Sequence, residues 1–341
     1  MEKTVSRRLS SFRKEFPIVE NCLYLDHAGV APVPSRVKYK VGTLFEELTG
    51  WGILRYQDWQ EEIELIRMSA AALIGASPGE LAFIKNTSQG ISIVAEGLNW
   101  EPGENVITFE NDFPSNLYPW MNLRRKGVEI KQLRLRSGRI HLEDIESLID
   151  SRTRVITMSS VQSLNGFMID LQALGKLCTD KGVLLFVDAI QSLGAVPMDV
   201  KKYGIDFLAA DGHKWMLAPE GTGIFYCREG LAEKLNPNLI GWKSVSHEHA
   251  FEKISLDLKK NAGRFEEGSL NTIGIYALGA SLSLLEEAGI QNIHARVLDL
   301  GDIIIRQARE RSLCIETPEE REERGGIISF SGDFDEKKLL E

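Results

Sequence analysis

The sequence has few cysteines and no cysteine motif. Its four cysteines, Cys22, Cys178, Cys227 and Cys314, are scattered, and no C-x-x-C pair occurs. This spacing excludes a zinc ribbon and a disulfide framework, and it is typical of proteins kept in a reducing compartment.

Long apolar runs and clustered positive charge are also missing. No run approaches the roughly 20 apolar residues that span a bilayer, and segment 1–16 lacks the apolar core of a signal sequence. The formal net charge is -9, without a basic stripe that would bind nucleic acid. We therefore expect a cytoplasmic protein whose partners include neither a membrane nor a nucleic acid. The "HEH" at 247–249 is expected to lie in an exposed loop, and no metal site is predicted.

The 341 residues do contain enough apolar side chains, 43%, for a large core. Seven short apolar runs, several of them nearly continuous, alternate with amphipathic segments, two of which, 115–127 and 170–182, read as helices ending in a glycine. The runs are 81–85, 105–109, 128–133, 154–158, 183–187, 206–210 and 223–227. Continuous apolar runs are typical of strands that are buried on both faces. The alternation predicts an α/β fold with a seven-stranded, mostly parallel sheet.

The pattern changes after Gly268. Segments 272–289 and 293–311 read as two long helices, followed by strands within 312–317 and 325–331. We predict a large domain over 19–280 and a smaller α+β domain formed by 1–18 and 281–341.

Polar residues follow five of the predicted strands. They occur in "NTSQG" (86–90), "ENDFPSN" (110–116), "SSVQS" (159–163), "DAIQS" (188–192) and "DGHKW" (211–215). Because ligands of open α/β sheets bind beyond the carboxyl ends of the strands, these segments are expected to line one cleft.

The segment "NTSQG" predicts an anion site. Thr87 and Ser88 stand at a helix start, where free N–H groups and the helix dipole favour negative charge, and Gly90 would allow close approach. The alternative is a simple helix N-cap.

Asp188 and Lys214 each have a chemical and a plain interpretation. An acid at the end of a buried strand needs a cationic or donor partner, although it could only cap the next helix. A lysine that is partly buried has a lowered pKa and can act as a nucleophile, although it could be an ordinary surface lysine.

Together these parts suit pyridoxal 5′-phosphate (PLP). The cofactor needs an anion seat, an acid for its ring nitrogen, a flat side chain to stack on its ring, and a lysine that holds its aldehyde as an aldimine. The same lysine can then move protons.

The ordered motifs resemble a known family. The chain carries "YLDHAGVAPVP" at 24–34, "VDAIQ" at 187–191, "DGHKW" at 211–215 and "RFEEGSLN" at 264–271. In this order they resemble class V aminotransferases of the fold-type I PLP superfamily, a group that includes cysteine desulfurases, selenocysteine lyases, isopenicillin N epimerase-like proteins and kynureninases.

The resemblance implies a role for each matching position. Lys214 matches the lysine that holds the cofactor, and Asp188 matches the acid on the pyridine nitrogen. The other matches are Gln162 and Gln191 near the phenolic oxygen, Thr87, Ser88, Asp211 and His213 on the phosphate side, and Gly268 and Ser269 in a segment that reaches the partner subunit's phosphate. The last pair implies a homodimer with shared active sites.

Two positions depart from the family pattern. Asp211 stands where desulfurases commonly have a hydroxyl residue, and since an anion repels phosphate it is expected to point elsewhere. Phe113 stands where desulfurases have a histidine over the ring, so it can stack but cannot carry a proton. This favours the epimerase-like branch.

The chain ends at Glu341, before the reactive cysteine loop and the substrate arginine of these relatives. We therefore expect a C-terminally truncated small domain and poor substrate handling, unless Arg55 or Arg264 substitutes for that arginine. Cys314 is expected to pack in the small-domain core. His27 is expected either to border the substrate or to be structural, and Trp242 to border the entrance.

The sequence thus predicts a PLP-dependent enzyme that removes the Cα proton of an amino acid through Lys214. Transamination, epimerisation and β-elimination stay open as outcomes. The alternatives are a cysteine desulfurase or selenocysteine lyase, and a PLP-binding protein with little turnover.

Overall fold

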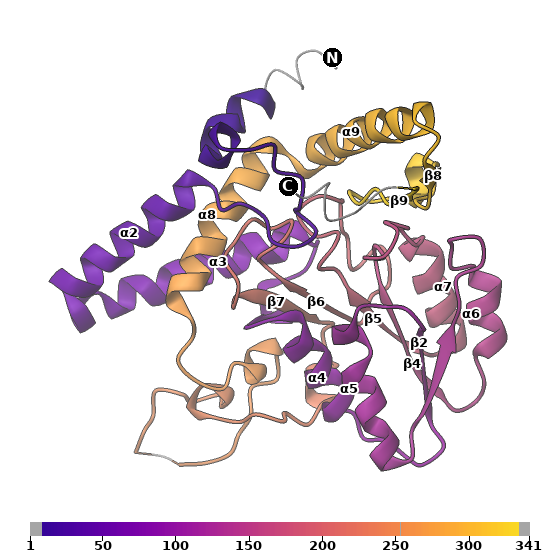
Figure 1. Cartoon of the computed structure of the whole chain (residues 1–341). Coiled ribbons are helices and arrows are strands. Elements are labelled where there is room, and N and C mark those ends of the chain that lie inside the picture. The colour runs from indigo at the N-terminus through magenta and orange to yellow at the C-terminus, as the bar shows by residue number, and fades with distance from the viewer. Residues whose placement is uncertain (1–8, 253, 334–341) are drawn as a thin grey trace.

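The structure is a computed structural model that describes residues 9–252 and 254–333. Residues 1–8 and 334–341, which the sequence assigns to the small domain, lie outside the described residues. Figure 1 shows a central sheet with helices on both sides, and α9 with the short strands β8 and β9 at one end.

All seven predicted strands of the large sheet are present. They are β1 (Leu81–Ile84), β2 (Asn105–Phe109), β3 (Glu129–Leu133), β4 (Thr153–Ser159), β5 (Leu184–Asp188), β6 (Phe207–Asp211) and β7 (Gly223–Cys227). Their order in the sheet is β1-β7-β6-β5-β4-β2-β3. Strand β7 is antiparallel to both of its neighbours, β1 and β6, and the remaining pairs are parallel. The predicted seven-stranded, mostly parallel sheet is therefore confirmed.

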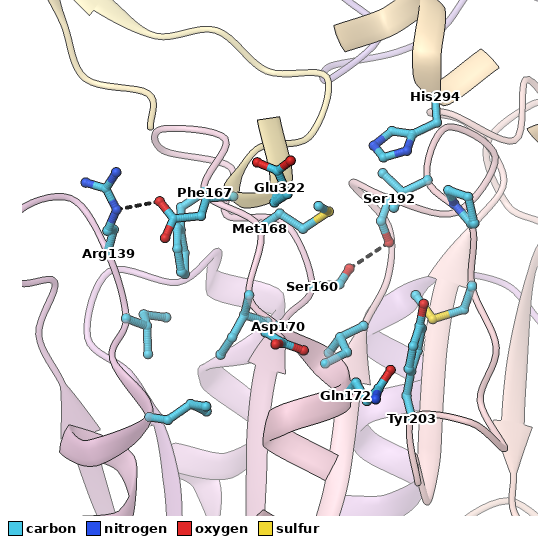
Figure 2. A pocket seen from close by; sticks show the side chains of 18 of the residues that line it. Arg139, Ser160, Phe167, Met168, Asp170, Gln172, Ser192, Tyr203, His294 and Glu322 are labelled. Carbon is cyan, nitrogen blue, oxygen red and sulfur yellow. Dashed lines mark hydrogen bonds and ion pairs between the residues drawn. The ribbon is translucent and has the colours of Figure 1, made fainter. Parts of the chain in front are cut away.

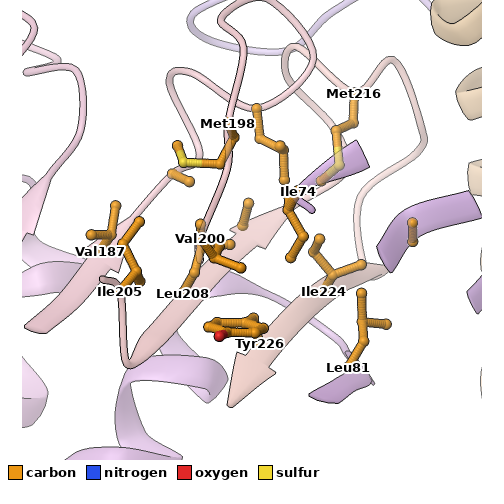
Figure 3. Packing of buried hydrophobic residues seen from close by; sticks show 14 of the residues in the cluster. Ile74, Leu81, Val187, Met198, Val200, Ile205, Leu208, Met216, Ile224 and Tyr226 are labelled. Carbon is orange, nitrogen blue, oxygen red and sulfur yellow. The ribbon is translucent and has the colours of Figure 1, made fainter. Parts of the chain in front are cut away.

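Helices cover both faces of this sheet, namely α3 (Tyr56–Leu73), α4 (Thr87–Gly97), α5 (Tyr118–Met121), α6 (Leu142–Leu148), α7 (Leu171–Lys181) and α8 (Thr272–Ala288). Helix α2 (Ser35–Gly50) packs on α8, and α9 (Ile290–Glu310) lies at one end of the molecule. One apolar core lies under α4 and α5, and the other lies between the opposite face and α3, α6, α7 and α8. Figure 3 shows part of the second core, where Leu208, Ile224 and Tyr226 pack together.

The alternation of side chains along the strands decides which residues face α4. In β5, Phe186 belongs to the α4 core, whereas Leu185 and Val187 belong to the opposite core. Continuing this period of two places Asp188 on the α4 side. Phe207 and Ala209 of β6 also belong to the α4 core, so the same period of two places Asp211 on the α4 side as well. Two acidic side chains thus end adjacent strands on one face.

The small-domain elements follow the sequence only in part. Helices α8 and α9 lie where two long helices are predicted, and β8 (Cys314–Ile315) pairs with β9 (Phe330–Ser331). The predicted boundary at residue 280 falls inside α8, which packs on α2 and α3. The division into two domains stays a prediction.

Two local expectations were wrong. Segment 115–127 is not one helix: α5 is only four residues long, with the imide of Pro119 in its first turn, and 3₁₀ turns flank it. A proline cannot donate the hydrogen bond of a helix interior, so a longer helix cannot run through this position. Cys314 lies in a strand but is exposed rather than packed in a core, because β8 and β9 form only a two-residue ladder.

Among the described residues, no single helix is both long and apolar enough to cross a bilayer. Helices α8 and α9 meet that criterion only when they are counted together across a 77° bend.

Candidate active site

A tight turn between β6 and β7 carries Lys214. The N–H of Gly212 donates to the carbonyl of Thr222 at 2.8 Å, and the N–H of Ala218 donates to the carbonyl of Gly212 at 2.9 Å. Leu217 has a φ of 61°, a left-handed conformation that is costly for a bulky side chain. The turn therefore holds its backbone in a fixed and partly strained form.

The Lys214 side chain is 8% exposed, and its Nζ lies 5.4 Å from the centre of the Phe113 ring. Burial lowers the pKa of the Lys214 ammonium, while the carboxylates of Asp188, Asp211 and Asp26 act in the opposite direction. A desolvated amine among carboxylates suits a group that must alternate between its neutral and charged forms.

The Asp188 side chain is 2% exposed and ends β5. Its Oδ1 accepts a hydrogen bond from the N–H of Ile190 at 3.0 Å, but the residues that follow form turns, so the alternative of a helix cap is wrong. That bond does not satisfy the charge: burial first, and then the neighbouring Asp112, raise the pKa of Asp188 to about 7. The carboxylate therefore lacks a counter-ion strong enough to hold it ionised, and a cationic ligand would supply one.

The sequence analysis did not single out Asp112, which lies in "ENDFPSN" after β2. Its carboxylate accepts hydrogen bonds from the Ser159 hydroxyl at 2.6 Å, the Asn116 amide at 2.7 Å and the Phe113 N–H at 2.8 Å. Burial nevertheless raises its pKa. Asp112 therefore anchors the backbone that carries Phe113. An acid just after a buried strand is the sequence signal by which Asp112 could have been predicted.

The four predicted phosphate-side residues gather at the start of α4. Asn86 caps this helix by accepting from the N–H of Gln89 at 2.9 Å, so the cap is not Thr87 or Ser88. The Thr87 hydroxyl accepts the N–H of Asp211 at 3.1 Å, and the Ser88 hydroxyl donates to Ser115 at 2.9 Å. The close approach that Gly90 allows is between helix and strand, not the expected approach of a ligand. A Cβ at Gly90 would lie 2.5 Å from Ala209, so the glycine lets α4 pack closely on β6.

Asp211 does not point away from this cluster. Its Oδ2 lies 3.1 Å from Nδ1 of His213, and neither that nitrogen nor Oδ1 of Asp211 has a hydrogen-bond partner although both are buried.

The two glutamines are buried just beyond the ends of β4 and β5. Gln162 donates to the carbonyl of Ser159 at 3.2 Å. Gln191 donates to the carbonyl of Ala28 at 3.1 Å and accepts from the indole N–H of Trp215 at 3.0 Å. The segment "YLDHAG" is therefore held against the lysine turn.

His27 stacks on Trp215, with ring centres 5.6 Å apart and planes 29° apart. Burial lowers the pKa of the His27 imidazole. The N–H of Ala31 donates to the carbonyl of His213 at 2.8 Å, which fixes the segment to the same turn.

Several candidates lie away from Lys214. Gly268 and Ser269 line a separate cavity of about 200 Å³ with Lys85, Gln89 and Thr222. Burial lowers the pKa of Arg264, which lies near Cys227, and Cys227 pairs with Phe207 at the opposite end of β6 from Asp211.

Three further candidates lie in surface segments. Arg55 pairs with Asp58 at 2.6 Å. His247 and His249 lie in a loop, as expected, where the Trp242 ring contacts His249 and Phe251.

A larger cavity of about 570 Å³ lies on the other side of the β4 and β5 ends (Figure 2). Its walls include His294 of α9 and a 2.6 Å hydrogen bond between Ser160 and Ser192. None of the predicted site residues lines it, so it is distinct from the Lys214 site.

The residues at Lys214 fit PLP. Asp188 is a buried acid that lacks a full counter-ion, and the orphaned polar atoms of Asp211 and His213 adjoin a helix start. With the buried lysine, this set is compatible with a PLP site on a fold-type I sheet.

The comparisons with known proteins give the family. The model of the family "Aminotransferase class-V" matches residues 23–338, and the chain belongs to the class V aminotransferases, which are PLP-dependent enzymes. A probable cysteine desulfurase of Methanothermobacter thermautotrophicus is 33% identical over 297 residues, which are 84% of this chain and 72% of that protein.

Solved structures agree with this fold. The apo structure of a cysteine desulfurase from Thermococcus onnurineus NA1 superimposes with a TM-score of 0.87 at 26% identity, covering 97% of this chain and 84% of that one. A C-DES variant with glycine covalently linked to its PLP cofactor has a TM-score of 0.87 at 20% identity, covering 94% and 86%. At that identity the second likeness concerns the fold alone.

Proposed function

We propose that Lys214 anchors PLP, that Asp188 binds its pyridine nitrogen, and that the enzyme removes the Cα proton of an amino acid. The observation that carries this proposal is the buried Lys214–Asp188 pair at the ends of neighbouring elements, in which each group shifts the other's pKa. PLP, when bound, supplies an electron sink for the pair of electrons left at Cα.

The residues of this chain divide the remaining work. Lys214, whose pKa is lowered by burial, accepts the Cα proton as a neutral amine and returns it elsewhere as the ammonium. Asp188 holds a proton at the pyridine nitrogen, because a cation there relieves the cost of its own buried charge. Phe113, whose half-exposed ring lies next to Nζ of Lys214, would offer a flat apolar surface to the cofactor ring.

Cysteine desulfuration is the second candidate. The relatives named as cysteine desulfurases favour it. Phe113 argues against it, because a phenyl ring cannot exchange the proton that an imidazole would supply over the cofactor.

The common step of all these reactions can be measured directly. We expect the PLP-loaded protein to exchange the Cα–H of at least one amino acid with D₂O, as followed by ¹H NMR over a panel that includes cysteine, cystine and alanine. Sulfide and alanine released from cysteine would identify desulfuration, a keto acid transamination or elimination, and the D-enantiomer epimerisation. Absence of Cα exchange across the panel would contradict the proposed function.

We also propose that the enzyme is a homodimer with shared active sites. Large apolar side chains are exposed from the second half of α2 to the start of α3, namely Phe45, Trp51, Ile53 and Leu54, and an exposed apolar patch commonly marks an interface. Gly268 and Ser269 line a cavity that Lys214 does not line, which suits a segment that serves a second subunit.

Light scattering coupled to size exclusion should give twice the chain mass for the PLP-loaded protein. Ile53→Asp with Leu54→Asp should shift the protein toward the monomer, because burying two carboxylates in an apolar interface is costly. The matched control is Leu300→Asp, an exposed apolar residue on α9. A fully PLP-occupied monomer of the unaltered chain would contradict the shared site.

A further inference from the structure

Asp211 is a buried acid at the place where the proposed function puts a phosphate. Its side chain is 6% exposed, and it lies on the α4 face of β6, beside Thr87 at the helix start. Burying a carboxylate without donors is costly, and its Oδ1 has no hydrogen-bond partner. A phosphate group beside it would add repulsion, so the residue needs a compensating role.

The imidazole of His213 lies beside Asp211 on the same turn. Oδ2 of Asp211 lies 3.1 Å from its Nδ1, and the His213 side chain is 15% exposed. The approach of Oδ2 to Nδ1 is a close contact rather than a hydrogen bond, because Nδ1 has no hydrogen-bond partner. A carboxylate beside one ring nitrogen of a histidine orients the ring. With Nδ1 facing Asp211, Nε2 is the nitrogen that remains, and its N–H can donate to an anion when the ring carries both protons.

The backbone of Asp211 contacts the Thr87 hydroxyl, a second group that could donate to phosphate. Its N–H donates to the Thr87 hydroxyl at 3.1 Å, which occupies a lone pair of that oxygen. A hydroxyl that already accepts one hydrogen bond still has its own proton to donate. Asp211 therefore contacts two of the groups that would bind phosphate, without being able to donate to phosphate itself.

We propose that Asp211 is a positioning residue that acts through His213 to strengthen the seat for the phosphate of PLP. This inference rests on the proposed function. Removing the negative charge of Asp211 from beside the phosphate is then expected to weaken phosphate binding. Simple repulsion predicts the opposite sign.

Asp211 also faces Lys214, whose ammonium feels it together with Asp188 and Asp26. An effect exerted through Lys214 must therefore be separated from one exerted through His213. Pyridoxine 5′-phosphate serves this purpose, because it has the ring and the phosphate but no aldehyde that could react with a lysine.

The test measures the Kd of pyridoxine 5′-phosphate for the apoprotein by titration calorimetry. Asp211→Asn is expected to weaken binding by about 10-fold, the size of one charge-assisted hydrogen bond. In a His213→Gln background the same substitution should have no weakening effect. Pyridoxine without phosphate should not respond to Asp211→Asn in either background.

The remaining outcomes contradict either this inference or the proposed function. Equal or tighter binding by Asp211→Asn overturns the inference, and so does an equal loss in the His213→Gln background. If Asp211→Asn does not fold, as judged by the Tm of the apoprotein, Asp211→Glu and Asp211→Ser take its place: the glutamate should retain dependence on His213, and the serine should lose it. Failure of the unaltered apoprotein to bind both PLP and pyridoxine 5′-phosphate would contradict the proposed function instead.

Discussion

Replacing Lys214 with alanine is expected to lower kcat by about 10³-fold and to abolish covalent retention of the cofactor. Lys214 is the buried amine of the β6–β7 turn, and burial lowers its pKa so that the neutral amine is accessible. Loss of a positioned acid–base group costs about 10²–10⁴-fold in rate. Borohydride reduction followed by peptide mapping should find a pyridoxyl group on Lys214 in the unaltered protein and none in the variant.

The control for this experiment is Lys176→Ala on α7. Lys176 is an exposed lysine that pairs with Asp180 one helical turn away, and its loss should leave kcat and labelling unchanged. The Lys214→Ala protein should still bind PLP reversibly through the residues at the start of α4. A pyridoxyl label on a different lysine of the unaltered protein would remove Lys214 from its assigned role.

Replacing Asp188 with asparagine is expected to lower kcat by about 10²–10³-fold, because the amide cannot hold a proton at the pyridine nitrogen against developing charge. The same substitution should stabilise the apoprotein at alkaline pH. The pKa of Asp188 is raised to about 7 in the folded chain from an ordinary 3.8. The folded state therefore favours the protonated acid, and stability is lost as pH rises through about 7.

This gives a pH-dependent difference between the two apoproteins. Above about pH 8 asparagine should stabilise the fold by up to about 4 kcal/mol, and the difference should shrink toward pH 4. Denaturation curves at pH 5, 7 and 9 measure it, with the exposed Asp180→Asn as the matched control. Unchanged turnover together with a flat pH difference would leave Asp188 as nothing more than the hydrogen-bond acceptor of the Ile190 N–H.

Most of the strands could be predicted because their side chains are buried on both faces. The runs 81–85, 183–187, 206–210 and 223–227 each contain at least four consecutive apolar residues, and a helix of that composition would need greater length. Strand β3, at the edge of the sheet, is mostly exposed or half-buried, and its run mixes apolar with polar residues. The acids Asp188 and Asp211 follow from the same pattern: a strand period of two, counted past the last apolar residue, places both on one face. The order of the strands and the reversal of β7 could not be read locally, because they depend on which strands meet after folding.

The rest of the site depends on contacts between distant segments. Asp112 is buried by Ser159, which is 47 residues away, and His27 by Trp215, so neither environment is visible in a local pattern. The interpretation of segment 115–127 as one helix gave too little weight to Pro119. Cys314 was assigned to a core because it lies in a strand, but β8 and β9 pair over only two residues and leave Cys314 exposed.

The reversal of β7 has a mechanical consequence. The turn that carries Lys214 leaves the sheet at Asp211 and re-enters it at Gly223, and these two residues are paired with each other. The turn is thus a loop clamped at both ends by the same pair of strands, whose shared hydrogen bonds would have to break before it could swing. Trp215 of this loop in turn supports the stacked ring of His27 and lies against the backbone at Gly326, so the position of Lys214 is coupled to both segments.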